Sequence, residues 1–201
     1  MDNIIIAITG PSGVGKTTLG DLLIYRNGFI APKHSTTRKR RNDDKKGFYR
    51  YLNHNDFKLY VNNNKFLFWS GDSEDINPKY GNYYGILKQD YEDVKENKKI
   101  IMFISYKDIE YINYLKNNGY NIKIVNLLYS DIEKNMPKRL MIDERNQTQE
   151  DINKRIKCAI DYEKRFGKIL DSYDILKIQS DVLDIEETYN TVVKRLVKKV
   201  R

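Results

Sequence analysis

Residues 4–17 read IIIAITGPSGVGKT. Residues 4–8 are apolar and mostly β-branched, which is typical of a strand covered on both faces of a parallel sheet. Residues 10–17 match the pattern G-x-x-x-x-G-K-[ST] in full, and a helix-like stretch follows them to about residue 26. Glycines let consecutive backbone N–H groups turn inward around an anion, and the start of a helix adds positive potential. The stretch therefore predicts a phosphate-binding loop between a strand and a helix.

The side chains of this loop predict binding of ATP or GTP. Lys16 is expected to reach the β- and γ-phosphates, and the Thr17 hydroxyl is expected to bind Mg²⁺ as the one metal ligand of the motif. The residues expected to bind ATP are Ser12, Gly13, Val14, Gly15, Lys16, Thr17 and Thr18. GTPases and helicases use such loops too, but no N-K-x-D-like guanine reader occurs here and a helicase needs more chain. A small-molecule kinase fits best.

Strand and helix patterns alternate along the rest of the chain. Further strands are predicted at 98–104, 122–128 and 174–178, and helices at about 107–117, 130–143, 149–168 and 184–199. This alternation predicts an α/β fold of the P-loop NTPase type, in which helices cover both faces of a parallel core sheet.

The segment 32–90 interrupts the alternation. It is rich in Tyr, Asn, Lys and Phe, and short strands are expected near 48–52 and 66–69. We interpret it as an inserted, small β-rich lobe. Residues 1–31 and 91–201 would then form the core, with a helical lid at about 130–155.

Composition limits the classes of protein that fit. The chain has 201 residues, a net charge of +8 and 40% hydrophobic residues, enough for one compact domain with an inserted lobe. No apolar run reaches the ~20 residues that cross a bilayer, and Cys158 is the single cysteine, so we expect a cytoplasmic protein without internal disulfides. The charge suits phosphate-bearing small molecules as well as nucleic acid, and cations in the last helix are ordinary dipole partners. A nucleic-acid partner ranks last, and a homodimer is left open.

Four further motifs lie in and after the lobe: HSTTRKRR at 34–41, GFYRY at 47–51, GNYYG at 81–85 and INKR at 152–155. Together with the phosphate-binding loop, in this order and at this spacing, they resemble the guanylate kinase family. The resemblance covers residues 4–196, almost the whole chain.

The resemblance implies transfer of the γ-phosphate of Mg–ATP to a nucleoside monophosphate. Arg38 and Arg41 would hold the acceptor phosphate through bidentate guanidinium contacts, and Tyr49 and Tyr84 would donate hydroxyl hydrogen bonds to it. The residues implied in acceptor binding are His34, Ser35, Arg38, Arg41, Tyr49, Phe68 and Tyr84. Those implied in catalysis are Lys16, Arg38 and the lid residues Arg139, Arg145 and Arg155.

The chain departs from the family pattern in three ways. The family has a glutamate that reads guanine before the lobe tryptophan, where this chain has Phe68 before Trp69. His34 occupies the place of a small hydroxyl residue, and Phe103 and Ser105 occupy the places of two acidic residues. An acidic segment follows Trp69, from which Asp72, Glu74 or Asp75 would have to supply a carboxylate. The acceptor is therefore GMP, dGMP or another, even modified, deoxynucleotide.

Two other functions remain open within this resemblance. Ribose 1,5-bisphosphate kinase resembles guanylate kinase and also lacks the glutamate, although residues 35–38 and 81–85 look more like the nucleotide enzymes. A non-catalytic interaction module typically loses the phosphate-binding loop, whereas Lys16 and Thr17 are present here. Turnover of a sugar phosphate alone would favour the first, and failure to bind Mg–ATP the second.

Overall fold

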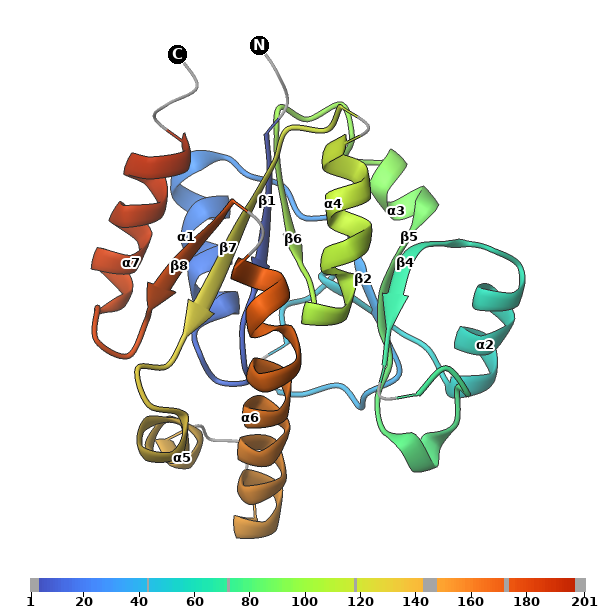
Figure 1. The fold of residues 1–201 in the computed structure, drawn as a ribbon. Coiled ribbons are helices and arrows are strands. Elements are labelled where there is room, and N and C mark those ends of the chain that lie inside the picture. The colour runs from blue at the N-terminus through green and yellow to red at the C-terminus, as the bar shows by residue number, and fades with distance from the viewer. Residues whose placement is uncertain are drawn as a thin grey trace.

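The computed structural model describes residues 4–42, 44–71, 73–117, 119–142, 148–171 and 174–197 (Figure 1). Four strands form the core sheet, in the order β6 (Lys99–Phe103), β1 (Ile4–Thr9), β7 (Ile122–Leu128) and β8 (Ile175–Gln179). Every neighbouring pair in this sheet is parallel. The predicted parallel core is confirmed, with its four strands at the expected places.

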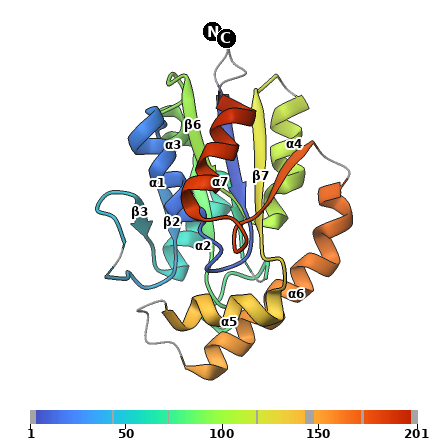
Figure 2. The same cartoon turned by 90° about the vertical axis from the view of Figure 1, so that its left-hand side faces the viewer.

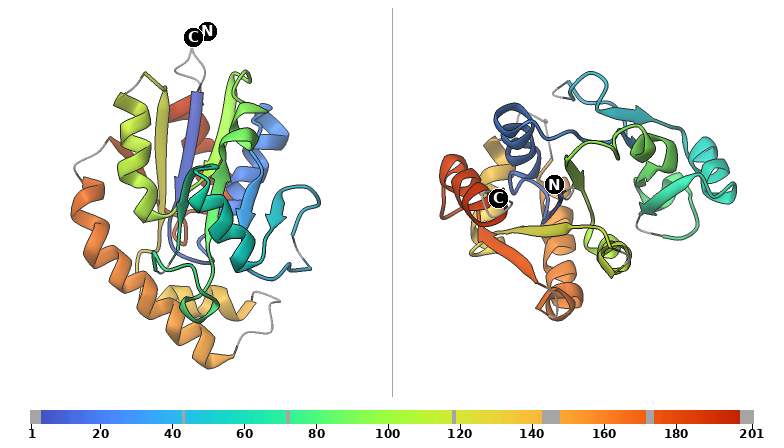
Figure 3. Two further views of the ribbon diagram at one scale, coloured as in Figure 1. Left: turned by 90° about the vertical axis from the view of Figure 1, so that its right-hand side faces the viewer. Right: turned by 90° about the horizontal axis from the view of Figure 1, so that it is seen from above.

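Helices cover both faces of the core sheet. α1 (Lys16–Asn27) and α7 (Ile185–Val192), which continues into η3 (Val193–Val197), lie on one face, and α4 (Ile109–Asn117) lies on the other (Figures 2 and 3). β1 is buried along its whole length because its side chains serve both layers. Ile6 and Ile8 pack with α1 and α7, and Ile5 packs with α4. This double burial is the reason why the β1 sequence is apolar at every position rather than at alternate ones.

α5 (Ile132–Ile142) and the first half of α6 (Gln149–Asp171) lie below the carboxyl ends of the core strands, beside the end of β1 (Figure 1). Met136 and Leu140 of α5 and Ile152 of α6 are buried in the same cluster as β1, which anchors both helices to the core. In the part of the chain that the structure describes, no helix is apolar over a sufficient length to cross a bilayer.

The segment between α1 and β6 forms a second, small sheet. Its strands are β3 (Tyr49–Tyr51), β2 (His34–Thr36), β5 (Tyr84–Leu87) and β4 (Phe66–Ser70), in that order. β2 and β3 are parallel, and β5 is antiparallel to both β2 and β4. The sequence predicted strands at β3 and β4 but not at β2 and β5, because three or four residues are too few to show a periodic pattern.

Helix α2 (His54–Asn62), the 3-10 turn η1 (Pro78–Tyr80) and helix α3 (Lys88–Glu92) complete this segment. α2 was also not predicted. Its start is set by Asn53, whose side chain accepts a hydrogen bond from the Asp56 backbone, and Phe57 is its one fully buried side chain. A single buried residue gives too weak a helical pattern to be recognised.

Cross-strand pairing divides the small sheet into two faces. One rung consists of Tyr51, Thr36, Tyr84 and Ser70, and the rung two residues away consists of Tyr49, His34, Ile86 and Phe68. Since residues two apart on a strand share a face, these two rungs lie on one face, here called the acceptor face. Trp69 lies on the opposite face, against Phe57.

Candidate active site

The glycine-rich loop connects β1 to α1 and has the backbone that only glycine adopts easily. Gly10 and Gly13 have φ values of +141° and +77°. A Cβ atom on Gly10 would lie 2.3 Å from the carbonyl oxygen of Leu127, so a side chain is excluded there. Gly15, also left-handed, precedes the first residue of α1. The loop therefore passes close to β7 and leaves the start of α1 open for an anion.

Lys16 folds back on its own loop, and the two threonines that follow it are exposed. Lys16 Nζ donates to the carbonyl oxygens of Gly10 (2.8 Å) and Pro11 (2.7 Å), so its ammonium group lies across the loop. Thr17 and Thr18, in the first turn of α1, are exposed. The hydroxyl of Ser180, the residue after β8, donates to the Val14 carbonyl at 2.7 Å and so ties the loop to the core sheet. No motif in the sequence pointed to Ser180.

Two arginines, one on α5 and one on α6, also contact this loop. Arg139 Nη1 donates to the Val14 carbonyl at 3.3 Å, and Arg155 Nη1 donates to Ser12 Oγ at 3.1 Å. The third arginine named from the sequence, Arg145, lies in 143–147, outside the described residues. The α5–α6 segment therefore brings two cations to the place where a triphosphate would lie.

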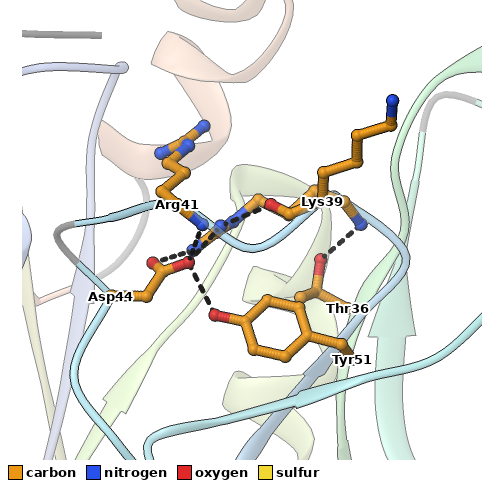
Figure 4. A network of polar contacts seen from close by, with 6 residues as sticks. Thr36, Lys39, Arg41, Asp44 and Tyr51 are labelled. Atoms are coloured by element: carbon orange, nitrogen blue, oxygen red, sulfur yellow. Dashed lines mark hydrogen bonds and ion pairs between the residues drawn. The ribbon is translucent and has the colours of Figure 1, made fainter.

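The loop after β2 contains a buried ion pair (Figure 4). Arg38 donates from Nη1 to Asp44 Oδ2 at 2.7 Å and from Nη2 to Asp44 Oδ1 at 2.5 Å, and both side chains are buried. The Tyr51 hydroxyl also donates to Asp44, at 2.6 Å. Burial alone would raise the pKa of Asp44, but the hydrogen bonds from Arg38, Tyr51 and the Arg41 backbone lower it below its usual value. Asp44 thus orders the whole loop.

Arg41 differs from Arg38 in its surroundings. Its backbone N–H donates to Asp44 Oδ2 at 2.6 Å, while its guanidinium group points away from that carboxylate (Figure 4). Arg38 is already paired by Asp44, and its guanidinium carbon lies 4.6 Å from the centre of the Tyr49 ring. The loop therefore holds Arg38 in a buried ion pair, whereas the guanidinium group of Arg41 extends away from that pair.

Tyr84 connects the acceptor face with the glycine-rich loop. Its side chain is 40% exposed at the end of β5. Burial raises the pKa of the Tyr84 hydroxyl, and the positive charges of Arg38, Arg41 and Arg155 oppose this rise. Among the arginines named from the sequence, Arg38, Arg41 and Arg155 therefore act electrostatically on Tyr84, and Arg155 does so while it contacts Ser12.

His34, Ser35 and Phe68 lie deeper than the resemblance implies. His34 Nδ1 donates to the Pro32 carbonyl (2.9 Å), and His34 Nε2 accepts from the Phe103 backbone (3.2 Å). Burial lowers the pKa of His34 to about 4, so its ring is neutral and both ring nitrogens are already engaged. Ser35 belongs to the rung that faces away from the acceptor face and is fully buried. Phe68 packs against Tyr111 of α4.

Phe103 belongs to an aromatic cluster between α1 and the small sheet. Its ring lies 5.6 Å from the centres of both the His34 and Phe48 rings. Gly20 of α1 makes room for it, because a Cβ there would come within 2.3 Å of the Phe103 ring. The position that the family fills with an acidic residue is therefore an apolar contact in this protein.

The acidic segment after Trp69 passes beside α2. The nearest oxygen of Asp75 lies 3.6 Å from Lys58 Nζ on α2, and both side chains are half exposed. Glu74 is exposed, and Asp72 lies outside the described residues. Another carboxylate, Asp108, is buried beside β4 in the 3-10 turn η2 (Tyr106–Asp108), where sequence reasoning expected only a helix.

Comparison with known proteins places the chain in a family. A family model described as guanylate kinase matches residues 2–199. The guanylate kinase of Campylobacter jejuni (strain RM1221) is 27% identical over 197 residues, which cover 96% of this chain and 89% of that protein. The guanylate kinase of Malacoplasma penetrans (strain HF-2) is 31% identical over 181 residues, covering 88% and 85%.

The fold is also found among solved structures. The crystal structure of guanylate kinase from Anaplasma phagocytophilum aligns with a TM-score of 0.66 and 17% identity, over 98% of this chain and 86% of that chain. This likeness confirms the P-loop NTPase fold. The chain belongs to the guanylate kinase family and is a phosphotransferase of that family's class.

Proposed function

We propose that this protein transfers the γ-phosphoryl group of ATP to the phosphate of a nucleoside monophosphate. The observation that carries the proposal is the position of Arg155, which contacts Ser12 of the glycine-rich loop and acts on the pKa of Tyr84 on the acceptor face. One cation thus serves two phosphate-binding elements. Phosphoryl transfer needs little more than alignment of donor and acceptor and neutralisation of charge.

Each side chain has a distinct role in this proposal. Lys16 exchanges its two carbonyl contacts for the β- and γ-phosphates of ATP, and Arg139 and Arg155 neutralise charge during transfer. Arg41 and the hydroxyls of Tyr49 and Tyr84 hold the acceptor phosphate. Arg38, held by Asp44, fixes the shape of the loop and presents its positive charge to the same phosphate.

Mg²⁺ fits this site as a partner of the nucleotide. Among the described residues, no group of three or more His, Cys, Asp or Glu side chains is placed to hold a metal ion. Thr17, exposed in the first turn of α1, has the hydroxyl that would bind Mg²⁺ together with phosphate oxygens. When bound, the ion would supply positive charge that helps to neutralise the phosphates, and the Thr17 hydroxyl would hold it.

The acceptor in this proposal is GMP, dGMP or another, even modified, deoxynucleoside monophosphate. The positions at which the family reads guanine are changed at His34 and Phe68, and two of its acidic positions are changed at Phe103 and Ser105, so the base does not follow from membership of the family. The phosphate-binding side chains do not depend on the base.

A coupled assay of ADP release tests the proposal. Purified protein with Mg–ATP is supplied in turn with each of the common ribo- and deoxyribonucleoside monophosphates. In a separate arm it is supplied with sugar phosphates, including ribose 1,5-bisphosphate. We expect release of ADP that depends on a nucleoside monophosphate and is lost in Lys16→Ala, which keeps its fold by circular dichroism. Turnover of sugar phosphates alone, or of nothing, would refute the proposal.

A further inference from the structure

A cavity of about 310 Å³ lies along the outer edge of β4. It is bounded by β4 on one side and by η2 and the start of α4 on another, and its lining includes Phe68, Trp69, Lys107, Asp108 and Tyr111. β4 is the edge strand of the small sheet, so no further strand covers this side among the described residues. The lining combines four aromatic side chains with one carboxylate, and it also includes Val61 of α2 and Asn64 of the turn after it.

That carboxylate, Asp108, is 5% exposed. Its Oδ2 atom accepts from the Ser105 backbone at 2.7 Å and from the Ser70 hydroxyl at 3.5 Å. Both contacts fall on Oδ2, and Oδ1 accepts no hydrogen bond from the described part of the chain. Capping of η2 therefore explains one oxygen of Asp108 and leaves the other without an explanation.

The nearest cation does not neutralise Asp108. Lys107 Nζ donates to the Gly71 carbonyl at 2.5 Å, and it lowers the pKa of Asp108 only weakly against the effect of burial. Burial raises this pKa to about 7. In the described part of the chain, the buried polar side-chain atoms without a hydrogen-bond partner belong to Thr9, Ser35 and Thr188, so Oδ1 of Asp108 keeps contact with solvent and is open to a donor on a ligand.

Two residues at the cavity belong to the same rungs of the small sheet as the tyrosines of the acceptor face. Ser70, which contacts Asp108, belongs to the same rung as Tyr84 and Tyr51, and Phe68, which lines the cavity, belongs to the rung of Tyr49. Neighbouring strands lie about 4.8 Å apart, so Ser70 is about 5 Å from Tyr84 and about 14 Å from Tyr51 across the face. This span suits a nucleotide whose phosphate lies near Arg41 and whose base reaches toward β4.

We propose that Asp108 selects the acceptor base by accepting a hydrogen bond from an exocyclic amino group through Oδ1. This inference rests on the proposed nucleoside monophosphate kinase activity. Asp108 differs in position from every residue that the family resemblance assigns to base recognition. The base lies against the cavity wall that Phe68 and Tyr111 form, which offers apolar contact without polar selectivity, and Asp108 supplies the polar contact.

The chemistry predicts which bases are preferred. Above its raised pKa the Asp108 carboxylate only accepts hydrogen bonds, so it attracts an amino group and repels a carbonyl oxygen at the same position. Bases with an exocyclic amino group are therefore preferred over bases that lack it, as guanine over hypoxanthine, and over bases that carry a carbonyl oxygen in its place, as cytosine over uracil. A site whose buried polar group is left unmatched rejects the wrong ligand strongly, so we expect a preference of at least ~10-fold in kcat/KM.

The test compares kcat/KM for GMP with IMP and for CMP with UMP, in wild type and in Asp108→Asn. Asparagine keeps a carbonyl oxygen for the Ser105 backbone but adds an amide donor, so the amino preference should fall at least ~10-fold or reverse. Asp93→Asn, at an exposed carboxylate that pairs with Gln89 on α3, is the matched control and should keep the wild-type ratio.

The outcomes separate the two proposals. Turnover of an amino-bearing base with a lower ratio in Asp108→Asn supports the role of Asp108. Turnover with no amino preference in wild type, or with an unchanged ratio in a folded Asp108→Asn, overturns that role and leaves the kinase activity standing. The wild-type comparison decides the matter even if the variant does not fold. No turnover of any nucleotide overturns the kinase proposal, and this inference with it.

Discussion

Arg155 and Ser12 are 143 residues apart in the chain and are joined by a hydrogen bond of 3.1 Å from Nη1 to Oγ. The contact brings a cation from α6 to the glycine-rich loop, where the donor phosphates would lie. Arg155 is also one of the positive charges that oppose the rise in the pKa of Tyr84, so its electrostatic effect extends to the acceptor face.

Replacement of Arg155 should reduce the rate of phosphoryl transfer more than substrate binding. A cation that stabilises the charge developing in the transition state typically raises kcat by a factor on the order of 10² or more. We therefore expect Arg155→Ala to lower kcat by about that factor in the coupled assay, with a smaller change in KM for ATP. Arg165→Ala changes an exposed arginine further along α6 and serves as the control. Equal effects of the two substitutions would contradict the assignment.

Arg41→Ala should raise the KM for the acceptor. The guanidinium group extends away from Asp44, and its removal deletes a phosphate contact without breaking the ion pair of Arg38 (Figure 4). We expect at least ~10-fold higher KM for the acceptor and little change in KM for ATP. Arg40→Ala, next to it and exposed, should leave both values near those of wild type. An unchanged acceptor KM in Arg41→Ala would refute the placement.

Asp44→Asn should weaken both the fold and acceptor binding. Removal of one charge from a buried ion pair costs about 3 kcal/mol, because the remaining charge of Arg38 is left buried without its partner. Asp75→Asn breaks a half-exposed pair with Lys58 and should cost no more than about 1 kcal/mol. Urea unfolding measures both values. Similar losses in the two variants would show that the Arg38–Asp44 pair does not organise the loop.

Asp108 should make the stability of the protein depend on pH. Its pKa is raised by burial from 3.8 to about 7, so the folded state holds this proton more tightly than the unfolded state. The stabilising contribution is full below about pH 4 and is lost as the pH rises to about 7. The free energy of unfolding of wild type should therefore fall relative to Asp108→Asn over that window, by on the order of 1.4 kcal/mol per unit of pKa shift. A constant difference between the two proteins would contradict the raised pKa.

The sequence was sufficient for the core and for the donor side of the site. Residues 4–8 have no alternation because both faces are buried, and the glycine pattern at 10–17 has one structural meaning in that setting. The long strands and helices of the core carry a periodic signal, and each appears where it was predicted.

The acceptor side was only partly predictable. β2 and β5 are too short to show a period, and the importance of Asp44 depends on a contact with Arg38 that spacing does not reveal. His34 and Phe68 were both assigned to the inserted lobe, His34 in a loop and Phe68 in a strand, but their burial follows from the packing of Phe103, Phe48 and Tyr111. Asp108 was missed because it stands in a sequence that looks like an ordinary helix start.

Affinity for a ligand that bridges both phosphate sites tests the central claim most directly. An adenosine joined through a chain of phosphates to the acceptor nucleoside found in the ADP-release assay would be measured by calorimetry. Linking two ligands whose sites face each other makes the second contact intramolecular. We expect the bridged ligand to bind at least ~100-fold more tightly than ATP, with loss of that gain in both Lys16→Ala and Arg41→Ala. Binding no tighter than that of ATP, or a gain that survives Arg41→Ala, would contradict a site built to join donor and acceptor.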